Sequence, residues 1–232
     1  MNLRISVSRI EQFRKYLDEE YNGFITQQSV IDDIRGVSIR KPAMILGLAY
    51  HALLEWDRKS IEMIPTENSD GDTARVRTPD MDTHIDFHPN LVQPALQYRL
   101  DHPHMIHEVP VTKRIKVGGF NITISGRIDG LEGFEGRDAK TGDRGMDVDL
   151  WGRSYQWKYY CWMAGLLRFH YDIFQFIYER KQLIGVKYDT FDFKPNMGNE
   201  NDCIRLVERF LDFCQQHKLM DFLIDKYAFE KK

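Results

Sequence analysis

The chain has 232 residues, 42% of them hydrophobic and 29% charged, which is ordinary for a soluble globular protein of one domain with a substantial core. Its formal net charge of −3 excludes a protein that is basic over its whole surface, and no apolar run is long enough to span a membrane, so no membrane partner is expected. Three cysteines without paired spacing and an N-terminus without a signal-peptide pattern predict a reducing, cytoplasmic location.

The first predicted elements are helices at residues 6–20 and 42–60, with weaker helical potential at 27–34. In the first helix Ser8 is a candidate N-cap, and Glu11 three residues later would complete a capping box. Residues 64–82 carry Pro, Asn, Ser, Gly and Asp with few large apolar side chains, which predicts a loop. Residues 89–100 suggest another helix.

The helix at 42–60 contains a histidine with two possible roles. Gly47 costs such a helix about 1 kcal/mol relative to Ala, which indicates a packing reason for it. His51 follows one turn later on the same side. It is either a core or surface histidine of an amphipathic helix, or an imidazole metal ligand that reaches a site because the helix approaches a sheet closely at Gly47.

Two carboxylates and a lysine lie on the predicted sheet. Strands at 107–117 and 120–131 are joined by a Gly118-Gly119 turn, and a third strand covers 135–140. Asp129 stands near the end of the second strand, and alternation puts Asp138 and Lys140 on one face of the third. The carboxylates can hold Mg²⁺ or Mn²⁺, and the lysine can orient an attacking water and offset charge on a phosphate. By itself Asp-x-Lys also describes a solvated surface pair.

A loop at 142–150 precedes a helix in which Gln156 and Tyr160 project together, an amide and a phenol that suit phosphate oxygens or a terminal nucleotide. The alternative is a helix whose aromatic residues all belong to the core. Strands at 174–180 and 183–193, a helix at 201–216 and a short helix at 219–228 complete the chain. These elements divide one domain into a helical part (1–104), a catalytic sheet with its helix (105–193) and C-terminal helices (201–230).

Five motifs follow one another along the chain: S-x-S-R-I-x-x-F from Ser6, G-x-x-x-H to His51, G-R-I-D to Asp129, D-x-K-T-G from Asp138 and Q-x-x-x-Y from Gln156. Together, over about residues 6–190, they resemble the RecB-like branch of the PD-(D/E)xK nuclease superfamily, in its stand-alone exonuclease type. The resemblance implies an α/β fold with a restriction-endonuclease-like core, in which helices flank a mixed central sheet.

The resemblance also implies the site. One or two Mg²⁺ or Mn²⁺ ions would be held by His51, Asp129, Asp138 and the Ala139 carbonyl, and Lys140 would be the catalytic lysine. Substrate-binding roles would fall to Gln156, Tyr160, Arg127 and Glu108, the last being the best match to a glutamate that relatives carry one strand earlier. The implied activity is metal-dependent hydrolysis of DNA, as an exonuclease in recombination, repair or phage replication. The implied partners are DNA and a single-strand annealing or other recombination protein.

The chain departs from the family pattern in two places. Ala139 stands where many relatives carry an aromatic residue. Relatives with an iron–sulfur cluster need four cysteines, but Tyr16 occupies the first position and only Cys161, Cys203 and Cys214 remain, so no cluster is expected. Two alternatives stay open: a CRISPR-adaptation nuclease that has lost its cluster, and a catalytically inert nucleic-acid-binding module, against which the intact motif residues speak.

Affinity for DNA in an acidic protein would come from a local basic track. The candidates for that track are Lys113, Arg114, Lys116, Arg127, Arg137, Arg144, Arg153 and Lys158. Histidines at 84 and 88, and at 102, 104 and 107, raise the possibility of zinc, but no cysteine lies near them, which favours surface histidines.

Overall fold

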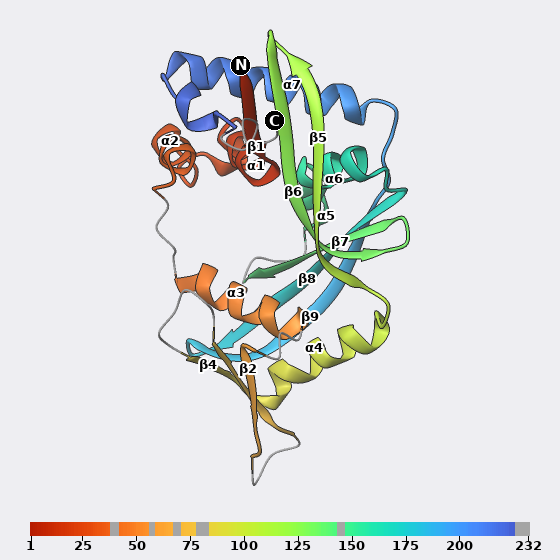
Figure 1. Ribbon diagram of the computed structural model, residues 1–232. Coiled ribbons are helices and arrows are strands. Elements are labelled where there is room, and N and C mark those ends of the chain that lie inside the picture. The colour runs from red at the N-terminus through yellow and green to blue at the C-terminus, as the bar shows by residue number, and fades with distance from the viewer. Residues whose placement is uncertain (38–41, 56–58, 67–70, 78–83, 143–146, 226–232) are drawn as a thin grey trace.

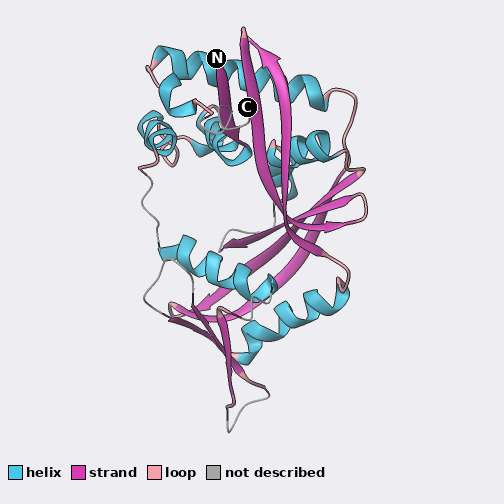
Figure 2. Cartoon of the chain, in the orientation of Figure 1, coloured by secondary structure: helices cyan, strands magenta, loops and turns pink. Residues whose placement is uncertain are grey.

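A mixed six-stranded sheet forms the centre of the computed structural model, which describes residues 1–37, 42–55, 59–66, 71–77, 84–142 and 147–225 (Figure 1). The strand order is β1-β6-β7-β8-β9, and β5 pairs with the remaining edge of β6. Helices flank this sheet (Figure 2), so the expected α/β class with a mixed central sheet is confirmed. The strands are β1 (Asn2–Ser6), β5 (Ile106–Val117), β6 (Phe120–Glu132), β7 (Glu135–Gly142), β8 (Arg168–Glu179) and β9 (Gln182–Phe193).

Two hydrophobic cores lie on opposite sides of the sheet. The first packs α1, α2, α6 and α7 against β1, β6 and β8, and the second packs α3, α4 and a small sheet against β7 and β8. Strand β8 contributes Phe169 and Tyr171 to the first core and Phe174 and Phe176 to the second, as expected for a strand buried on both faces. The helices are α1 (Val7–Tyr16), α2 (Gln27–Arg35), α3 (Pro42–Glu55), α4 (Pro89–Asp101), α5 (Val148–Gly152), α6 (Gln156–Ala164) and α7 (Asn199–Gln216), with 3₁₀ turns at Glu19–Tyr21 and Met220–Leu223.

In the described ranges, no helix has both the length and the apolar composition needed to cross a bilayer.

The loop predicted at 64–82 is wrong in part. Strands β2 (Ile61–Ile64), β3 (Thr73–Arg77) and β4 (His84–Phe87) form a small antiparallel sheet below α3 and α4 in Figure 1. The strands have four or five residues; β3 buries Ala74 and Val76, β4 buries Phe87 alone, and no residue of β2 is fully buried. Alternation over so few residues does not predict a strand. Residues 67–70 and 78–82 of the predicted loop lie outside the described residues.

The start of the chain also differs from its prediction. Strand β1 buries Leu3 and Ile5 and pairs in parallel with β6, and it runs directly into α1. The helix therefore begins at Val7, and its N-cap is Ser6, whose hydroxyl accepts a hydrogen bond from the Arg9 N–H at 3.3 Å. The capping box predicted from Ser8 is wrong, because Ser8 lies inside the helix. The helix also ends at residue 16 rather than 20.

Other boundaries moved as well. The strand predicted at 174–180 begins at Arg168, and the loop predicted at 142–150 overlaps the short helix α5. The helix predicted at 219–228 is a 3₁₀ turn at Met220–Leu223, and residues 143–146 and 226–228 of these two predictions lie outside the described residues. The part of the chain predicted to be helical, 1–104, also contains four strands.

Two different strands, β1 and β7, pair with the same edge of β6 and leave a gap between them. That edge pairs with β1 over Asn121–Ser125 and with β7 over Gly130–Glu132, while β5 takes the opposite edge. Residues 126–129 pair with neither β1 nor β7. We call this unpaired stretch of the edge the notch.

Candidate active site

The predicted site residues meet at the notch, and four different elements supply them. His51 comes from α3, Asp129 from β6, Asp138 and Lys140 from β7, and Gln156 from the first turn of α6. The Asp129 carboxylate bridges the notch, since its Oδ2 accepts a hydrogen bond from the Ala139 N–H on β7 at 3.1 Å. The same oxygen lies 3.8 Å from Nδ1 of His51.

Strand β7 presents its acid and its lysine on one face, as alternation predicted. Asp138 is 2% exposed, and its Oδ2 forms an ion pair with the ammonium of Lys140. Gln156 binds both groups: its Oε1 accepts from Lys140 Nζ at 3.0 Å, and its Nε2 donates to Asp138 Oδ1 at 3.1 Å. The amide therefore fixes the acid and the lysine relative to each other.

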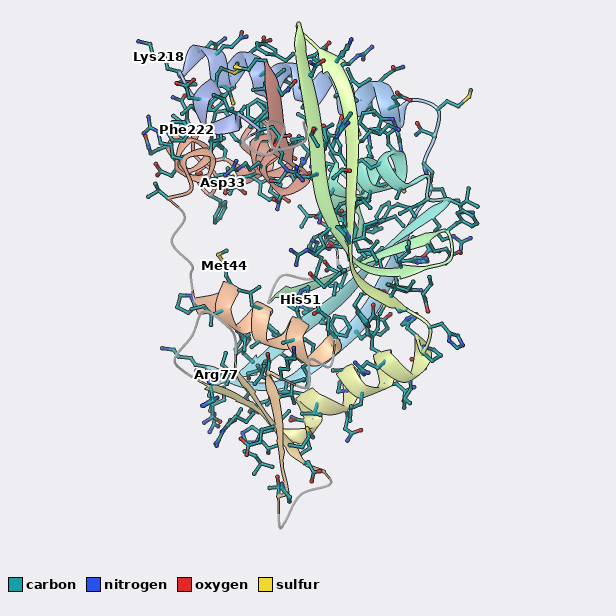
Figure 3. The ribbon with its side chains drawn as sticks, viewed as in Figure 1. Asp33, Met44, His51, Arg77, Lys218 and Phe222 are labelled. Carbon is teal, nitrogen blue, oxygen red and sulfur yellow. The ribbon has the colours of Figure 1, made fainter. Side chains whose placement is uncertain are left out.

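Helix α3 approaches β7 closely at Gly47. A Cβ atom at this position would lie 2.7 Å from the hydroxyl oxygen of Thr141, the residue after Lys140. One turn later, His51 lies on the side of α3 that faces the central sheet (Figure 3). The packing reason expected for Gly47 is thus confirmed.

The site brings two carboxylates, Asp129 and Asp138, and the Lys140 ammonium together where little water reaches them. Desolvation raises the pKa of Asp129 well above its usual value, and the neighbouring Asp138 charge raises it further. Burial acts to lower the pKa of Lys140, but Asp138 and Asp129 outweigh it, so the pKa is raised and the side chain stays an ammonium. Desolvation lowers the pKa of His51, which favours the neutral imidazole.

These donors suit a hard divalent cation. Two carboxylates, a neutral imidazole and the backbone of Ala139 are the types of ligand that Mg²⁺ and Mn²⁺ accept. Asp138 Oδ2 is buried against the Lys140 ammonium, and no donor in the described part of the chain gives it a hydrogen bond of ordinary geometry. Within that part, no three His, Cys, Asp or Glu side chains already stand as a closed metal cage. The Lys140 ammonium occupies the side of Asp138 Oδ2 that an ion bound to this oxygen would share.

Arg127 in the notch forms an ion pair with Glu108 on the neighbouring strand β5. Glu108 has φ of +58°, in the left-handed region that non-glycine residues adopt at a cost, and its register with β6 is interrupted opposite Asp129. Arg127 is 66% exposed in its side chain. Both residues thus border the site without contacting the buried carboxylates through a hydrogen bond of their own.

Tyr160 does not line an open path as predicted. It is 4% exposed and stacks on Phe169 at a centroid distance of 5.7 Å, because α6 packs this side of its ring into the first core. Burial raises the pKa of its phenol, which hydrogen-bonds with Gln156 and with the backbone of Arg127. Tyr160 therefore lies in the core next to the site, where it contacts Gln156 and the backbone of the notch.

Gly126 in the notch is needed for this packing. A Cβ atom there would lie 2.6 Å from the ring of Tyr160 and 3.2 Å from a methyl of Val7, and both side chains are buried. We expect Gly126→Ala to lower the free energy of unfolding by about 1–3 kcal/mol through overpacking, measured by urea denaturation. Gly185→Ala is the control, since nothing lies within 4 Å of its Cβ position. Equal stability of the two variants would contradict the role given to Tyr160.

Two residues of the site were missed from the sequence. Glu11 is 6% exposed; its Oε1 accepts from Arg14 at 3.0 Å and its Oε2 from the Tyr155 N–H at 2.9 Å, which joins α1 to the start of α6. His107 is half-buried rather than a surface histidine, and it hydrogen-bonds with the backbone of Asp129. The available signal in the sequence was an acid and a base, Glu11 and Arg14, three residues apart on the side of the predicted helix that carries its apolar residues.

No protein-family model and no curated protein sequence matches the chain. Among solved structures, it is similar to SSO0001, with a TM-score of 0.50 at 15% identity, over 90% of this chain and 75% of that one. It is also similar to the alkaline exonuclease LHK-Exo from Laribacter hongkongensis (TM-score 0.48, 11% identity, 92% and 89% covered) and to LHK-Exo in complex with dAMP (0.47, 12%, 92% and 88%). The likeness to SSO0001 shows the fold alone, and the other two are too distant to bear on activity.

Proposed function

We propose that the chain is a metal-dependent deoxyribonuclease that hydrolyses phosphodiester bonds, acting as an exonuclease in recombination, repair or phage replication. The observation that carries the proposal is the meeting of His51, Asp129, Asp138 and Lys140 at one gap in the sheet. A surface Asp-x-Lys pair would be solvated, whereas Asp138 is buried and held by Gln156. DNA, and a single-strand annealing or other recombination protein, are the proposed partners.

Each residue has a distinct task in this proposal. Asp129, Asp138, His51 and the Ala139 carbonyl would hold one or two Mg²⁺ or Mn²⁺ ions. When bound, such an ion supplies a Lewis acid that polarises the phosphate and makes water easier to deprotonate.

Lys140, kept protonated by the two acids, orients the attacking water and offsets the charge that develops on the phosphate oxygens. Gln156 accepts a hydrogen bond from Lys140 Nζ and so fixes the direction in which the ammonium points. Asp138 Oδ2 is the oxygen that Lys140 pairs with, so an ion held by Asp138 would compete with the ammonium, which would then be available to the phosphate.

Metal dependence is the first test. We expect linear DNA labelled at its 5′ or 3′ end to be degraded in Mg²⁺, and at least as fast in Mn²⁺, because the acids are hard donors and His51 is an intermediate one. EDTA should abolish the activity. Gel analysis of single- and double-stranded substrates measures both the rate and the end at which digestion begins.

Closed circular DNA of the same sequence is the control for exonuclease action and should remain intact. Complete digestion in EDTA would refute the metal assignment. Failure to cleave any substrate in either metal, with binding retained, would instead identify an inert nucleic-acid-binding module.

A further inference from the structure

The first half of β6 and its neighbours β1 and β5 present a polar, uncovered side. Leu3, Ile5, Ile122 and Ile124 point into the first core under α1, α6 and α7. Their alternate residues point the other way and line a surface groove, where no helix among the described elements covers them.

Pairing arranges the outward residues in rows across the three strands. Thr123 at the centre of one row stands between Arg4 on β1 and Arg114 on β5. In the next row Asn121 stands between Asn2 and Lys116. We call this surface, defined by Arg4, Arg114 and Lys116, the basic face.

The basic face carries a charge opposite to that of the whole protein. None of its three cations forms an ion pair with another described residue, whereas the described part of the chain gives partners to the other candidates, Lys113, Arg127, Arg137, Arg153 and Lys158. Arg144, the remaining candidate, lies outside the described residues. Asp225 is the one acid among the described residues that line the groove; it is 6% exposed, and its N–H donates to the carbonyl of Asn2. A surface with free cations in a protein of net charge −3 is complementary to a polyanion.

The basic face leads to the candidate active site. Along β6, Asn121, Thr123, Ser125 and Arg127 point to the same side, a length of about 20 Å at the rise of a strand. Arg127 ends this line in the notch, two residues before Asp129 on the same strand, and its side chain is 66% exposed.

The dimensions of the face suit one nucleic-acid strand. Strands lie about 4.8 Å apart, so Arg4 and Arg114 emerge about 10 Å from each other on either side of Thr123. A single sugar–phosphate backbone fits between them, but a duplex is wider. Between the cations the groove is lined by the hydroxyl and amide side chains of Asn2, Thr112, Asn121 and Thr123, with Ile115 and Ile122 beneath them. These polar groups can bind phosphates, and none of the described lining residues carries an aromatic ring on which a base could stack.

We propose that the basic face holds the phosphate backbone of a single DNA strand and guides it to Asp129 and Asp138 at the notch. This inference rests on the proposed function and adds the path and strandedness of its substrate. Recognition through phosphates alone makes binding independent of sequence and strongly dependent on salt.

The test is the triple variant R4Q/R114Q/K116Q. Fluorescence anisotropy in EDTA would measure binding of a labelled single strand of about 12 nucleotides, a blunt duplex and a trinucleotide. Loss of three phosphate contacts should weaken binding of the longer single strand about 10- to 100-fold near 0.1 M salt and reduce the slope of log affinity against log salt by about 2. The trinucleotide, which is too short to reach both the site and the face, should be affected less.

The matched control is R205Q/R209Q/K218Q, which also removes three positive charges. Arg205 and Arg209 lie on α7 and Lys218 lies just after it, on the opposite side of the sheet. It should bind and cleave as the wild type does. If the wild type cleaves DNA and R4Q/R114Q/K116Q binds the longer single strand with wild-type affinity and salt slope, the inference is wrong while the proposed function stands. A loss confined to the duplex also overturns it. If the variant loses single-strand binding but the wild type cleaves nothing, the basic face is supported and the proposed nuclease activity fails.

Discussion

Asp138→Asn is expected to reduce DNA cleavage more than about 10³-fold. The substitution keeps the size of the side chain and an oxygen that can accept the Gln156 hydrogen bond, but it removes the buried charge. Losing a metal ligand removes several kcal/mol of stabilisation of the transition state, and each 1.36 kcal/mol is tenfold in rate. Initial rates on end-labelled DNA in saturating Mn²⁺ measure the loss.

Metal binding gives a second readout for this variant. An ion that binds the folded state raises the melting temperature, so Mn²⁺ should stabilise the wild type and leave Asp138→Asn unchanged. Asp86→Asn is the control, because Asp86 is an exposed acid paired with Arg75 in the small sheet, away from the site. Equal stabilisation of wild type and Asp138→Asn by Mn²⁺ would overturn the assignment of Asp138 as a ligand.

Lys140→Met is expected to slow cleavage by about 10²–10³, or ~3–4 kcal/mol, the usual cost of removing one electrostatic contact to the transition state. Its effect on metal binding should be the reverse of that of Asp138→Asn. Without the ammonium, the buried Asp138 keeps its hydrogen bond from Gln156 but loses its counter-charge, so the protein should melt at a lower temperature in EDTA. Mn²⁺ should then stabilise it at least as much as it stabilises the wild type, because a nearby positive charge has gone.

The control for the lysine is Lys187→Met, the same substitution on the exposed part of β9. Lys140→Arg tests geometry, since a planar guanidinium keeps the charge but cannot reproduce a compact ammonium between Asp138 and Gln156. Should Lys140→Met cleave at the wild-type rate in saturating Mn²⁺, the Asp-x-Lys pair takes no part in the chemistry.

Features set by neighbouring residues could be predicted from the sequence. The β5–β6 hairpin was placed within a residue or two because both strands alternate and because Gly118 and Gly119 have positive φ angles, as a tight hairpin turn requires. The contact of Asp138 with Lys140 follows from the period of a strand. The approach of α3 to β7 was inferred from one glycine in a helix, Gly47.

Features that depend on residues far apart in the chain could not be predicted from the sequence. Strand β1 is five residues long, and its pairing with Asn121–Ser125 has no local signal. Tyr160 projects with Gln156 from α6, but only the position of Phe169 decides that its ring is buried. The hydrogen bond from Tyr155 to Glu11 likewise connects residues that are close only after folding.

The notch has a consequence for how the protein fluctuates. Residues of β6 that pair with both β1 and β5, or with both β5 and β7, have a strand on each edge. Residues 126–128 pair with β5 alone, and Asp129 has no partner in the register of either edge. Hydrogen–deuterium exchange should therefore find two slow stretches in β6 separated by a faster one, in the middle of a central strand. Local opening would begin where Asp129 lies, so the acid can shift by small amounts without unfolding either core.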